Sequence, residues 1–386
     1  MSRLDELIRE LCPDGVPFKK VKEVYTRIKG TPITAAKMKE IENPNGNIRI
    51  FAGGKTIIDA IEEDIPNANI TRVPAMLVQS RGVIDVIYYD KPFTFKNEMW
   101  AYTCSETTSI KFLYYVFKNN IQKFRDAASG MGSLPQISLP VTEEFVIPVP
   151  PLPVQHEIVR ILDSFSELTA ELTAELSARQ KQYEYYRKKL LSFGTQIRWG
   201  RIGDIGKVSM CKRIMKNETS TNGGVPFFKI GTFGKKADAY ISEDTFERYK
   251  AQYSYPKKGD ILISAAGTIG RTVVFDGEPA YFQDSNIVWV ANDERVVLNK
   301  FLYYWYQTSP WKVSTGGTIS RLYNDNIAGA KVPILPIETQ RRIIYILERF
   351  DKVCNDITSG LPAEIAARQK QYEYYRDKLL TFKPVA

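Results

Sequence analysis

A block of nine residues, RQKQYEYYR, occurs twice in the chain, at residues 179–187 and again at residues 368–376. The match extends outward, because residues 174–193 and 363–382 are identical at 16 of 20 positions. The two blocks lie 189 residues apart in a chain of 386 residues. Self-similarity at a fixed separation is the sequence signature of a repeated structural unit. The chain is therefore expected to contain two copies of one plan.

Other segments recur in the same order before each block. KFLYY at residues 111–115 returns unchanged at 300–304. VIPVPPLPVQHEIVRIL at 146–162 matches the pattern of KVPILPIETQRRIIYIL at 331–347. Each copy is thus predicted to run from a strand-rich region, through a strand punctuated by proline, to a long helix.

The strand-rich regions share their layout but little of their sequence. VPFKKVKEV at 16–24 and IRWGRIGDI at 197–205 both read as an opening strand. MLVQSRG at 76–82 and ILISAAGTIGR at 261–271 are both apolar runs that end in a glycine turn, a pattern typical of strands. The helical parts are therefore nearly duplicated while the globular parts have diverged.

Residues 154–193 contain no glycine or proline and are predicted to form one helix of about 60 Å, at 1.5 Å per residue. TAEL occurs twice in tandem at 169–176, a four-residue step that a coiled coil absorbs by local unwinding. In the second copy, SGLP at 359–362 predicts a break, because glycine stops a helix and proline begins one. Apolar residues at steps of three and four form a predicted seam in the first helix: Ile158, Ile161, Phe165, Leu168, Leu172, Leu176, Tyr183, Tyr186, Leu190 and Phe193.

These patterns predict an α+β fold with a pseudo-two-fold internal repeat. Two strand-rich mixed α/β domains are separated by two long helices that form an antiparallel coiled coil. The alternatives are helices that pack only on their own domains, or helices that mediate homodimerisation. The predicted parts are a first domain at residues 1–148, a helical spacer at 149–195, a second domain at 196–335 and a C-terminal helical spacer at 336–386.

Composition excludes several classes of site. The four cysteines show no CxxC spacing, which argues against a disulfide framework and against a zinc cluster. His156 is the only histidine in the chain, which removes most histidine-based triads and multi-histidine metal sites. We expect His156 to be a capping or surface residue. The apolar runs are short and interrupted by charge, so a soluble, cytoplasmic protein with no membrane span is expected.

The net charge of +9 is concentrated on the two strand-rich segments. Residues 18–148 hold 17 basic and 14 acidic side chains, and residues 196–335 hold 19 and 13. A basic excess among aromatic residues suits a nucleic-acid surface.

Lys and Arg can neutralise phosphates, and Arg, Asn and Gln can also read purine edges. Each such residue could equally be a solvated surface charge. We expect two glycine-rich segments to be flexible loops that approach DNA, namely SGMGS at 129–133 and Gly316 with Gly317. The candidate DNA contacts, chosen for their turn context, are Lys55, Arg81, Lys96, Asn97, Arg125, Lys212, Arg213, Lys235, Lys236, Arg271, Gln283 and Arg321.

The two RQKQYEYYR blocks carry charged residues and tyrosines around the helix. In most helices such a face is simply solvated. Its near identity in the two copies favours two equivalent docking surfaces for a partner. The candidate docking residues are Lys181, Tyr185, Arg187 and Lys188 in the first copy, and Lys370, Tyr374 and Arg376 in the second.

Together, the tandem TAEL, the RQKQYEYYR blocks and PVPPLPVQHEIVRIL at 148–162 resemble the specificity subunit of type I restriction-modification systems, in the subgroup with TAEL repeats. The resemblance covers essentially the whole chain. It implies a non-catalytic reader of double-stranded DNA whose two domains are target-recognition domains, with one half-site for each domain and the helical spacer as a ruler between half-sites.

The resemblance also implies partners. Two modification subunits would dock on the helices and methylate adenine N6 with S-adenosylmethionine. Restriction subunits would add ATP-driven translocation and cleavage with Mg²⁺. This chain would hold no cofactor or metal and would act in a prokaryotic cytoplasm.

Two other classes of function remain open at this point. A self-contained DNA adenine methyltransferase or nuclease is disfavoured, because no NPP followed by an aromatic residue occurs and no paired-carboxylate cluster is followed by lysine. A coiled-coil protein adaptor is the other alternative. Sequence-dependent binding to duplex DNA at physiological salt would distinguish it from a DNA reader.

Overall fold

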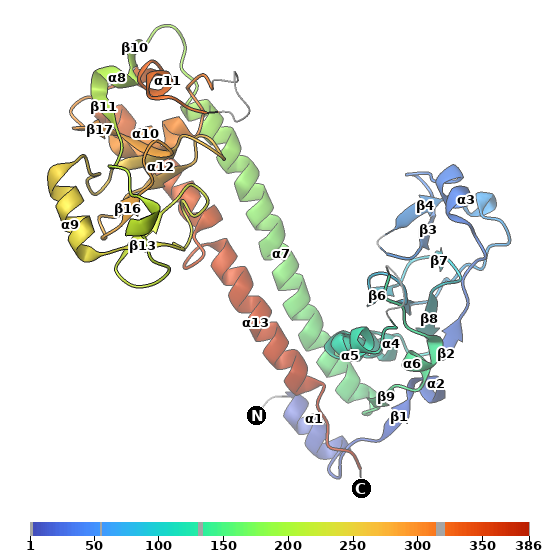
Figure 1. Cartoon of the computed structure of the whole chain (residues 1–386). Helices are drawn as coiled ribbons and strands as arrows, with labels where there is room; N and C mark the ends of the chain where they lie inside the picture. Colours follow the sequence, from blue (N-terminus) through green and yellow to red (C-terminus); the bar gives the residue numbers. More distant parts are fainter. Residues whose placement is uncertain (1–2, 55, 130–133, 314–320, 386) are drawn as a thin grey trace. The chain divides into compact units, whose positions relative to one another are not determined.

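The computed structural model describes residues 3–54, 56–129, 134–313 and 321–385, which form two compact units (Figure 1). Unit 1 consists of Met1–Ala174 and Glu364–Ala386, and unit 2 of Glu175–Ala363. Unit 1 therefore combines the N-terminal part of the chain with its C-terminal helix. Unit 2 takes in the second half of the first long helix.

Unit 1 contains a four-stranded sheet in the order β2-β8-β5-β6, a three-stranded sheet in the order β4-β3-β7 and a two-stranded pair, β1-β9. Neighbouring strands are antiparallel except β3 and β7. β5 is buried along its whole length, as expected of the apolar run that it contains. The strands are β1 (Phe18–Lys20), β2 (Thr26–Ile28), β3 (Ile48–Phe51), β4 (Ile57–Ala60), β5 (Ala75–Gln79), β6 (Asp85–Tyr89), β7 (Phe93–Phe95), β8 (Trp100–Thr103) and β9 (Val146–Pro148).

Unit 2 repeats this arrangement strand for strand. Its four-stranded sheet has the order β11-β17-β14-β15, its three-stranded sheet the order β13-β12-β16, and β10 pairs with β18. The parallel pair, β12 and β16, occupies the corresponding place. The predicted strand-rich mixed α/β class is confirmed. The strands are β10 (Arg198–Arg201), β11 (Gly206–Ser209), β12 (Val225–Phe228), β13 (Tyr240–Ile241), β14 (Ile261–Ser264), β15 (Thr272–Val274), β16 (Tyr281–Phe282), β17 (Ile287–Asn292) and β18 (Lys331–Ile334).

The two KFLYY segments form α4 and α10, whose phenylalanine and leucine are buried in the core of their own unit. Unit 1 also contains α1 (Arg3–Leu11), α2 (Val21–Val24), α3 (Ala35–Glu40), the 3-10 helix η1 (Glu62–Asp64), α4 (Thr107–Asn119), α5 (Ile121–Asp126) and α6 (Leu139–Glu143). Unit 2 contains α8 (Ile202–Ile205), the 3-10 helix η2 (Lys216–Glu218), α9 (Glu243–Gln252), α10 (Asn299–Tyr306), α11 (Asn324–Ala328) and α12 (Ile337–Asn355).

The first long helix, α7 (Leu152–Leu190), is uninterrupted over 39 residues, as the sequence predicts. The second helical region is divided into α12 and α13 (Leu361–Leu379). Between them the Asp356 side chain accepts hydrogen bonds from Thr358 and Ser359, and the Gly360 N–H donates to the Asp356 carbonyl at 2.9 Å. The predicted break at SGLP is confirmed. Every residue of the predicted seam is buried or half-buried, although α7 ends at Leu190 and Phe193 lies just beyond the helix.

In unit 1, α13 passes along the N-terminal half of α7 in the opposite direction (Figure 1). The ring of Phe165 on α7 lies 6.4 Å from that of Tyr372 and 5.6 Å from that of Tyr375, between centroids. Arg376 donates from Nε to Asn119 Oδ1, at the end of α4, at 2.7 Å. Residues of the second RQKQYEYYR block therefore connect α13 to both α7 and α4.

The first block makes the same contacts in unit 2. Phe350 on α12 stacks on Tyr183 and Tyr186 of α7, with centroids 6.0 and 5.5 Å apart. Arg187 donates to Gln307 Oε1, just after α10, at 3.4 Å. The same kind of packing thus occurs twice, and it accounts for the two tyrosines and the arginine that each block contributes.

Candidate nucleic-acid interface

The loops that follow β12, β14 and β16 converge in unit 2, and backbone hydrogen bonds join them. Gln283, just after β16, donates from its N–H to the carbonyl of Phe228 at the end of β12, at 2.9 Å. Ala265, just after β14, donates to the carbonyl of Asn286 at 2.7 Å and accepts from the N–H of Leu322 at 2.9 Å. Residues from four separate parts of the sequence thus form one surface.

The corresponding loops converge in unit 1. The N–H of Lys96, just after β7, donates to the carbonyl of Phe51 at the end of β3, at 2.9 Å. The N–H of Ile137 donates to the carbonyl of Ser80, just after β5, at 2.9 Å. Lys96 therefore occupies the position that Gln283 holds in unit 2. Loops exposed at the ends of a rigid sheet are where binding residues commonly lie.

A cleft of about 530 Å³ opens on these loops in unit 2. Three of the predicted DNA contacts line it, namely Arg213, Gln283 and Arg321. Arg213 Nε lies 2.9 Å from Asp284 Oδ2, and the Arg213 side chain is 67% exposed. Arg321 Nη2 donates to the carbonyl of Ser285 at 3.0 Å. These contacts hold two guanidinium groups at the cleft, where positive charge attracts phosphate.

Two lysines that sequence reasoning missed, Lys216 and Lys229, line the same cleft. Lys229 is the first residue after β12, the same kind of position as Gln283 after β16. A rule that collects every basic or amide residue directly after a strand would have found Lys229. Lys216 lies in the 3-10 helix η2 and does not directly follow a strand, so the same rule would not have found it.

The other predicted contacts of unit 2 lie outside this cleft. Arg271 is half-buried and donates from Nη1 to the carbonyl of Phe233 at 3.0 Å, so part of its guanidinium stabilises a loop. The Lys212 ammonium lies 5.2 Å from the centre of the Tyr253 ring. Lys235 and Lys236 are exposed. Their role in DNA contact stays a prediction.

A second cleft of about 530 Å³ lies in unit 1. Asn97 lines it together with Gln136, which sequence reasoning missed. Arg81 is exposed, and its backbone forms an isolated β-bridge with Gln136. Lys96 Nζ lies 3.1 Å from Glu98 Oε1. Unit 1 thus presents a mixture of positive, negative and amide groups where unit 2 is more strongly basic.

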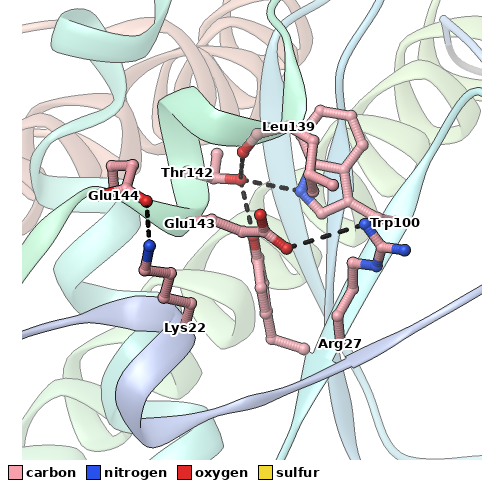
Figure 2. A network of polar contacts seen from close by, with 8 residues as sticks. Lys22, Arg27, Trp100, Leu139, Thr142, Glu143 and Glu144 are labelled. Atoms are coloured by element: carbon pink, nitrogen blue, oxygen red, sulfur yellow. Dashed lines mark hydrogen bonds and ion pairs between the residues drawn. The ribbon is translucent and has the colours of Figure 1, made fainter.

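One buried hydroxyl holds α6 beside the cleft of unit 1 (Figure 2). Trp100 Nε1 donates to Thr142 Oγ1 at 2.9 Å, and the Thr142 hydroxyl donates to the carbonyl of Leu139 at 3.1 Å. The Tyr102 hydroxyl, 2.7 Å from the same oxygen, must therefore be a donor to it. Burial raises the pKa of Tyr102 to about 12, which keeps that proton in place. This network fixes the end of the segment that lines the cleft.

Ion pairs on the outside of α6 support the same position. Glu144 pairs with Lys20, at 2.7 Å, and with Lys22. The hydrogen bonds from these two lysines lower the pKa of Glu144 to about 2. Arg27, which lines the cleft, lies 3.7 Å from Glu143. Because these pairs are largely exposed, each contributes little to stability.

Arg125 is exposed on α5 and donates from Nε to the carbonyl of Ile84 at 3.2 Å, which places it beside the loop after β5. Lys55, Gly316, Gly317 and residues 130–133 lie outside the described residues.

The predicted docking residues divide into two groups. Tyr185 and Tyr374 hold equivalent positions in the two blocks and are 60% and 63% exposed. Arg187 and Arg376 are half-buried and make the internal contacts described above. The remaining three, Lys181, Lys188 and Lys370, are exposed. The exposed members of the set are thus tyrosines and lysines.

Within the described residues, no three His, Cys, Asp or Glu side chains are grouped so that they could hold a metal ion. His156 is exposed on the first turns of α7. None of the helices in the described part of the chain has the length and apolar character of a membrane span.

Comparison with known sequences identifies the family. The pattern of the type I restriction modification DNA specificity domain matches residues 13–179 and again residues 197–367. A putative type I restriction enzyme specificity subunit from Haemophilus influenzae is 52% identical over 75% of this chain and 77% of its own length. The EcoR124I/EcoR124II specificity subunit from Escherichia coli is 32% identical over 71% of each chain.

Solved structures with low sequence identity share the fold. The S subunit of a type I restriction-modification system from M. genitalium has a TM-score of 0.60 at 17% identity and covers 95% of this chain and 96% of its own. A chain from a study of complex assembly and conformational transition in a type I system has a TM-score of 0.54 at 15% identity, with 95% and 98% covered.

None of these comparisons supports a self-contained methyltransferase or nuclease, or a coiled-coil adaptor. The two matches of the family pattern together cover most of the chain, one match for each copy of the repeat. The chain belongs to the type I restriction-modification DNA specificity family and is a non-catalytic DNA-recognition subunit.

Proposed function

We propose that each unit reads one half of a split DNA target through its converging loops. The observation that carries this proposal is the pair of clefts, one in each unit, which share the loop after β7 or β16 and the segment at Gln136 or Arg321. Both clefts are lined by arginine, lysine and amide side chains. The strands beneath the loops correspond one to one, while the residues on the loops differ. Two readers built on one frame suit a target made of two different half-sites.

Candidate contacts in unit 2 are Arg213, Gln283 and Arg321, with Lys216 and Lys229 toward phosphates. Candidate contacts in unit 1 are Arg81, Lys96 and Asn97, with Gln136. We also propose phosphate contacts for Lys55, Arg125, Lys212, Lys235, Lys236 and Arg271.

Catalysis in this proposal belongs to partners. Two modification subunits would dock on the helical blocks, one near the exposed Tyr185 with Lys181 and Lys188, the other near the exposed Tyr374 with Lys370. They would carry S-adenosylmethionine and methylate adenine at N6 in each half-site, which requires the base to leave the stack. Restriction subunits with ATP and Mg²⁺ would complete the complex.

We further propose that α7 acts as a ruler between half-sites. The tandem TAEL at residues 169–176 lies inside this continuous helix. Four added helical residues advance a helix by about 6 Å and turn it by about 40°. One DNA base pair advances by about 3.4 Å and about a tenth of a turn. The rotations match, while the advance of the helix exceeds that of one base pair, so the docking geometry must take up the remainder. On this proposal, inserting one TAEL lengthens the preferred spacer by about one base pair and leaves both half-sites unchanged. A change of half-site with the same spacer would contradict this.

Methylome sequencing tests the proposal as a whole. A methylation-free host would express this chain with its cognate modification subunit, and each protein alone as controls. We expect a split motif with N6-methyladenine in each half only when both proteins are present. Methylation by this chain alone would overturn the non-catalytic assignment, and no sequence-specific methylation in any host would overturn the proposal.

A further inference from the structure

The cleft of unit 2 contains two amide side chains whose orientation is fixed by internal hydrogen bonds. The backbone N–H of Ile230 donates to Gln283 Oε1 at 2.9 Å. A backbone N–H can only donate, so it must face the amide oxygen of Gln283 and not the nitrogen. Within the described residues, Gln283 Nε2 has no hydrogen-bond acceptor. This side chain therefore offers the cleft its donor end.

The orientation of the Asn286 side-chain amide is fixed in the same way. Arg321 Nη2 donates to Asn286 Oδ1 at 3.4 Å and to the carbonyl of Ser285 at 3.0 Å. An arginine has no acceptor, so the oxygen of Asn286 faces the guanidinium and the Asn286 NH₂ group is left for another partner. The remaining N–H groups of Arg321 add further donors at the same place.

One carboxylate oxygen of the acidic side chain in this cleft is occupied. Asp284 is 16% exposed, and its Oδ2 accepts from Arg213 Nε at 2.9 Å and from the Ser285 hydroxyl at 3.2 Å. Gln283 Oε1, Asp284 Oδ2 and Asn286 Oδ1 thus each have a donor inside the protein. The groups that remain for a ligand are mainly donors from amide, guanidinium and lysine side chains, and Asp284 Oδ1 is an acceptor beside them.

The loop that carries these groups is held at both ends by backbone hydrogen bonds. Its first and last residues are tied to neighbouring strands through the backbone bonds of Gln283 and Asn286. Ser285 has a φ of +58°, a conformation that a residue with a side chain adopts only when its surroundings impose it. A preorganised set of donors loses little entropy on binding, which favours a specific ligand over a general attraction to phosphate.

Base edges differ in what they offer to such a surface. In the major groove guanine presents two acceptors, N7 and O6, and thymine presents one, O4, beside a methyl group. Cytosine presents an amino donor, and adenine presents one acceptor beside an amino donor, so guanine matches a set of several donors best. We propose that the cleft formed around residues 283–286 and Arg321 selects guanine, so that the half-site read by unit 2 contains a guanine that this cleft contacts. This inference rests on the proposed function, and it assigns a base to one of the two readers.

An isosteric substitution tests this assignment. Gln283→Glu keeps an oxygen for the Ile230 N–H and replaces the outward NH₂ by a second oxygen, which turns a donor into an acceptor. The assembled methyltransferase, carrying either wild-type or variant chain, would be measured for binding to duplexes in which each position of the unit 2 half-site is varied in turn. Gln252→Glu, at the exposed end of α9, is the matched control for added negative charge.

We expect the wild-type half-site to contain a guanine at which Gln283→Glu lowers the preference over cytosine or adenine by about tenfold, within the range that one base contact provides. The half-site of unit 1 should not change, and Gln252→Glu should affect all sequences alike. A specific unit 2 half-site without guanine, or an unchanged preference in Gln283→Glu, would overturn the inference while leaving the proposed function intact. Absence of any sequence preference in the wild-type complex would overturn both.

Discussion

Units 1 and 2 have the same strand order in all three of their sheets, yet their binding loops have little in common. The aromatic contacts between the helices are repeated in the two units, and in each unit an arginine of the block reaches an amide oxygen at the end of α4 or just after α10. The clefts differ, because Lys96 beside Glu98 in unit 1 corresponds to Gln283 beside Asp284 in unit 2. Residues that join the helices are duplicated, and residues that line the clefts are not.

The largest expected loss of stability comes from removing the aromatic contacts that the two units share. Phe165→Ala should destabilise unit 1, and Phe350→Ala unit 2, by about 2 kcal/mol each, because both variants remove a half-buried ring from two tyrosines. Urea unfolding followed by hydrogen exchange in each unit would measure the two losses. Tyr345→Ala, on the exposed face of α12, is a control that should cost less than about 0.5 kcal/mol. Losses that differ severalfold between the two Phe variants would break the equivalence of the units.

A smaller loss of stability, which differs between the units, is expected from removing the hydrogen bonds of Arg376 and Arg187. Asn119→Ala removes a charge-assisted hydrogen bond of 2.7 Å to Arg376 and should cost about 1.5 kcal/mol. Gln307→Ala removes a bond of 3.4 Å to Arg187 and should cost less than about 0.5 kcal/mol. The same unfolding measurement applies. Asn119→Asp, which keeps an acceptor for Arg376, should restore most of the loss, and equal costs for both alanine variants would contradict the difference in geometry.

The smallest effect concerns the ion pairs on α6. The pKa of Glu144 is lowered to about 2 by hydrogen bonds from Lys20 and Lys22. A carboxyl group whose pKa is lowered in the folded state stabilises that state above its ordinary pKa, and the contribution is lost as the pH falls toward the lowered value. The difference in thermal midpoint between wild type and Glu144→Gln should therefore be constant above about pH 5.5 and shrink between about pH 4.5 and pH 3. A difference that grows on acidification would contradict the sign of this pKa change.

The helical part of the fold was predictable from the sequence because its signals are local. Absence of glycine and proline marked α7, SGLP marked the break before α13, and the spacing of apolar residues marked the buried face. Val154 and Leu162 are fully buried as well, although the seam pattern omitted them. Both side chains face the core of unit 1. A seam pattern for two helices considers only the contacts between those helices, so it does not predict residues that pack against the rest of the unit.

The arrangement of the loops was not predictable in the same way. Gln283 and Arg321 are 38 positions apart and meet because β16 and the segment before α11 are both tied to the loop after β14. The spacing of residues along the sequence does not indicate these hydrogen bonds. Turn context chose several residues that line the clefts, but it also chose Arg271, which donates to a loop carbonyl, and it passed over Lys229 and Gln136.

Half-site binding by variants of the two clefts tests the central claim most directly. Once the split motif is known, the assembled methyltransferase would be prepared with Arg81→Ala in unit 1 or Arg321→Ala in unit 2. Each complex would be titrated with duplexes in which one half-site or the other is scrambled. We predict that each variant loses discrimination at only one half-site, a different one for each variant, and keeps it at the other. If both variants weakened discrimination at the same half-site, or at both equally, the account of two independent readers on one repeated frame would be wrong.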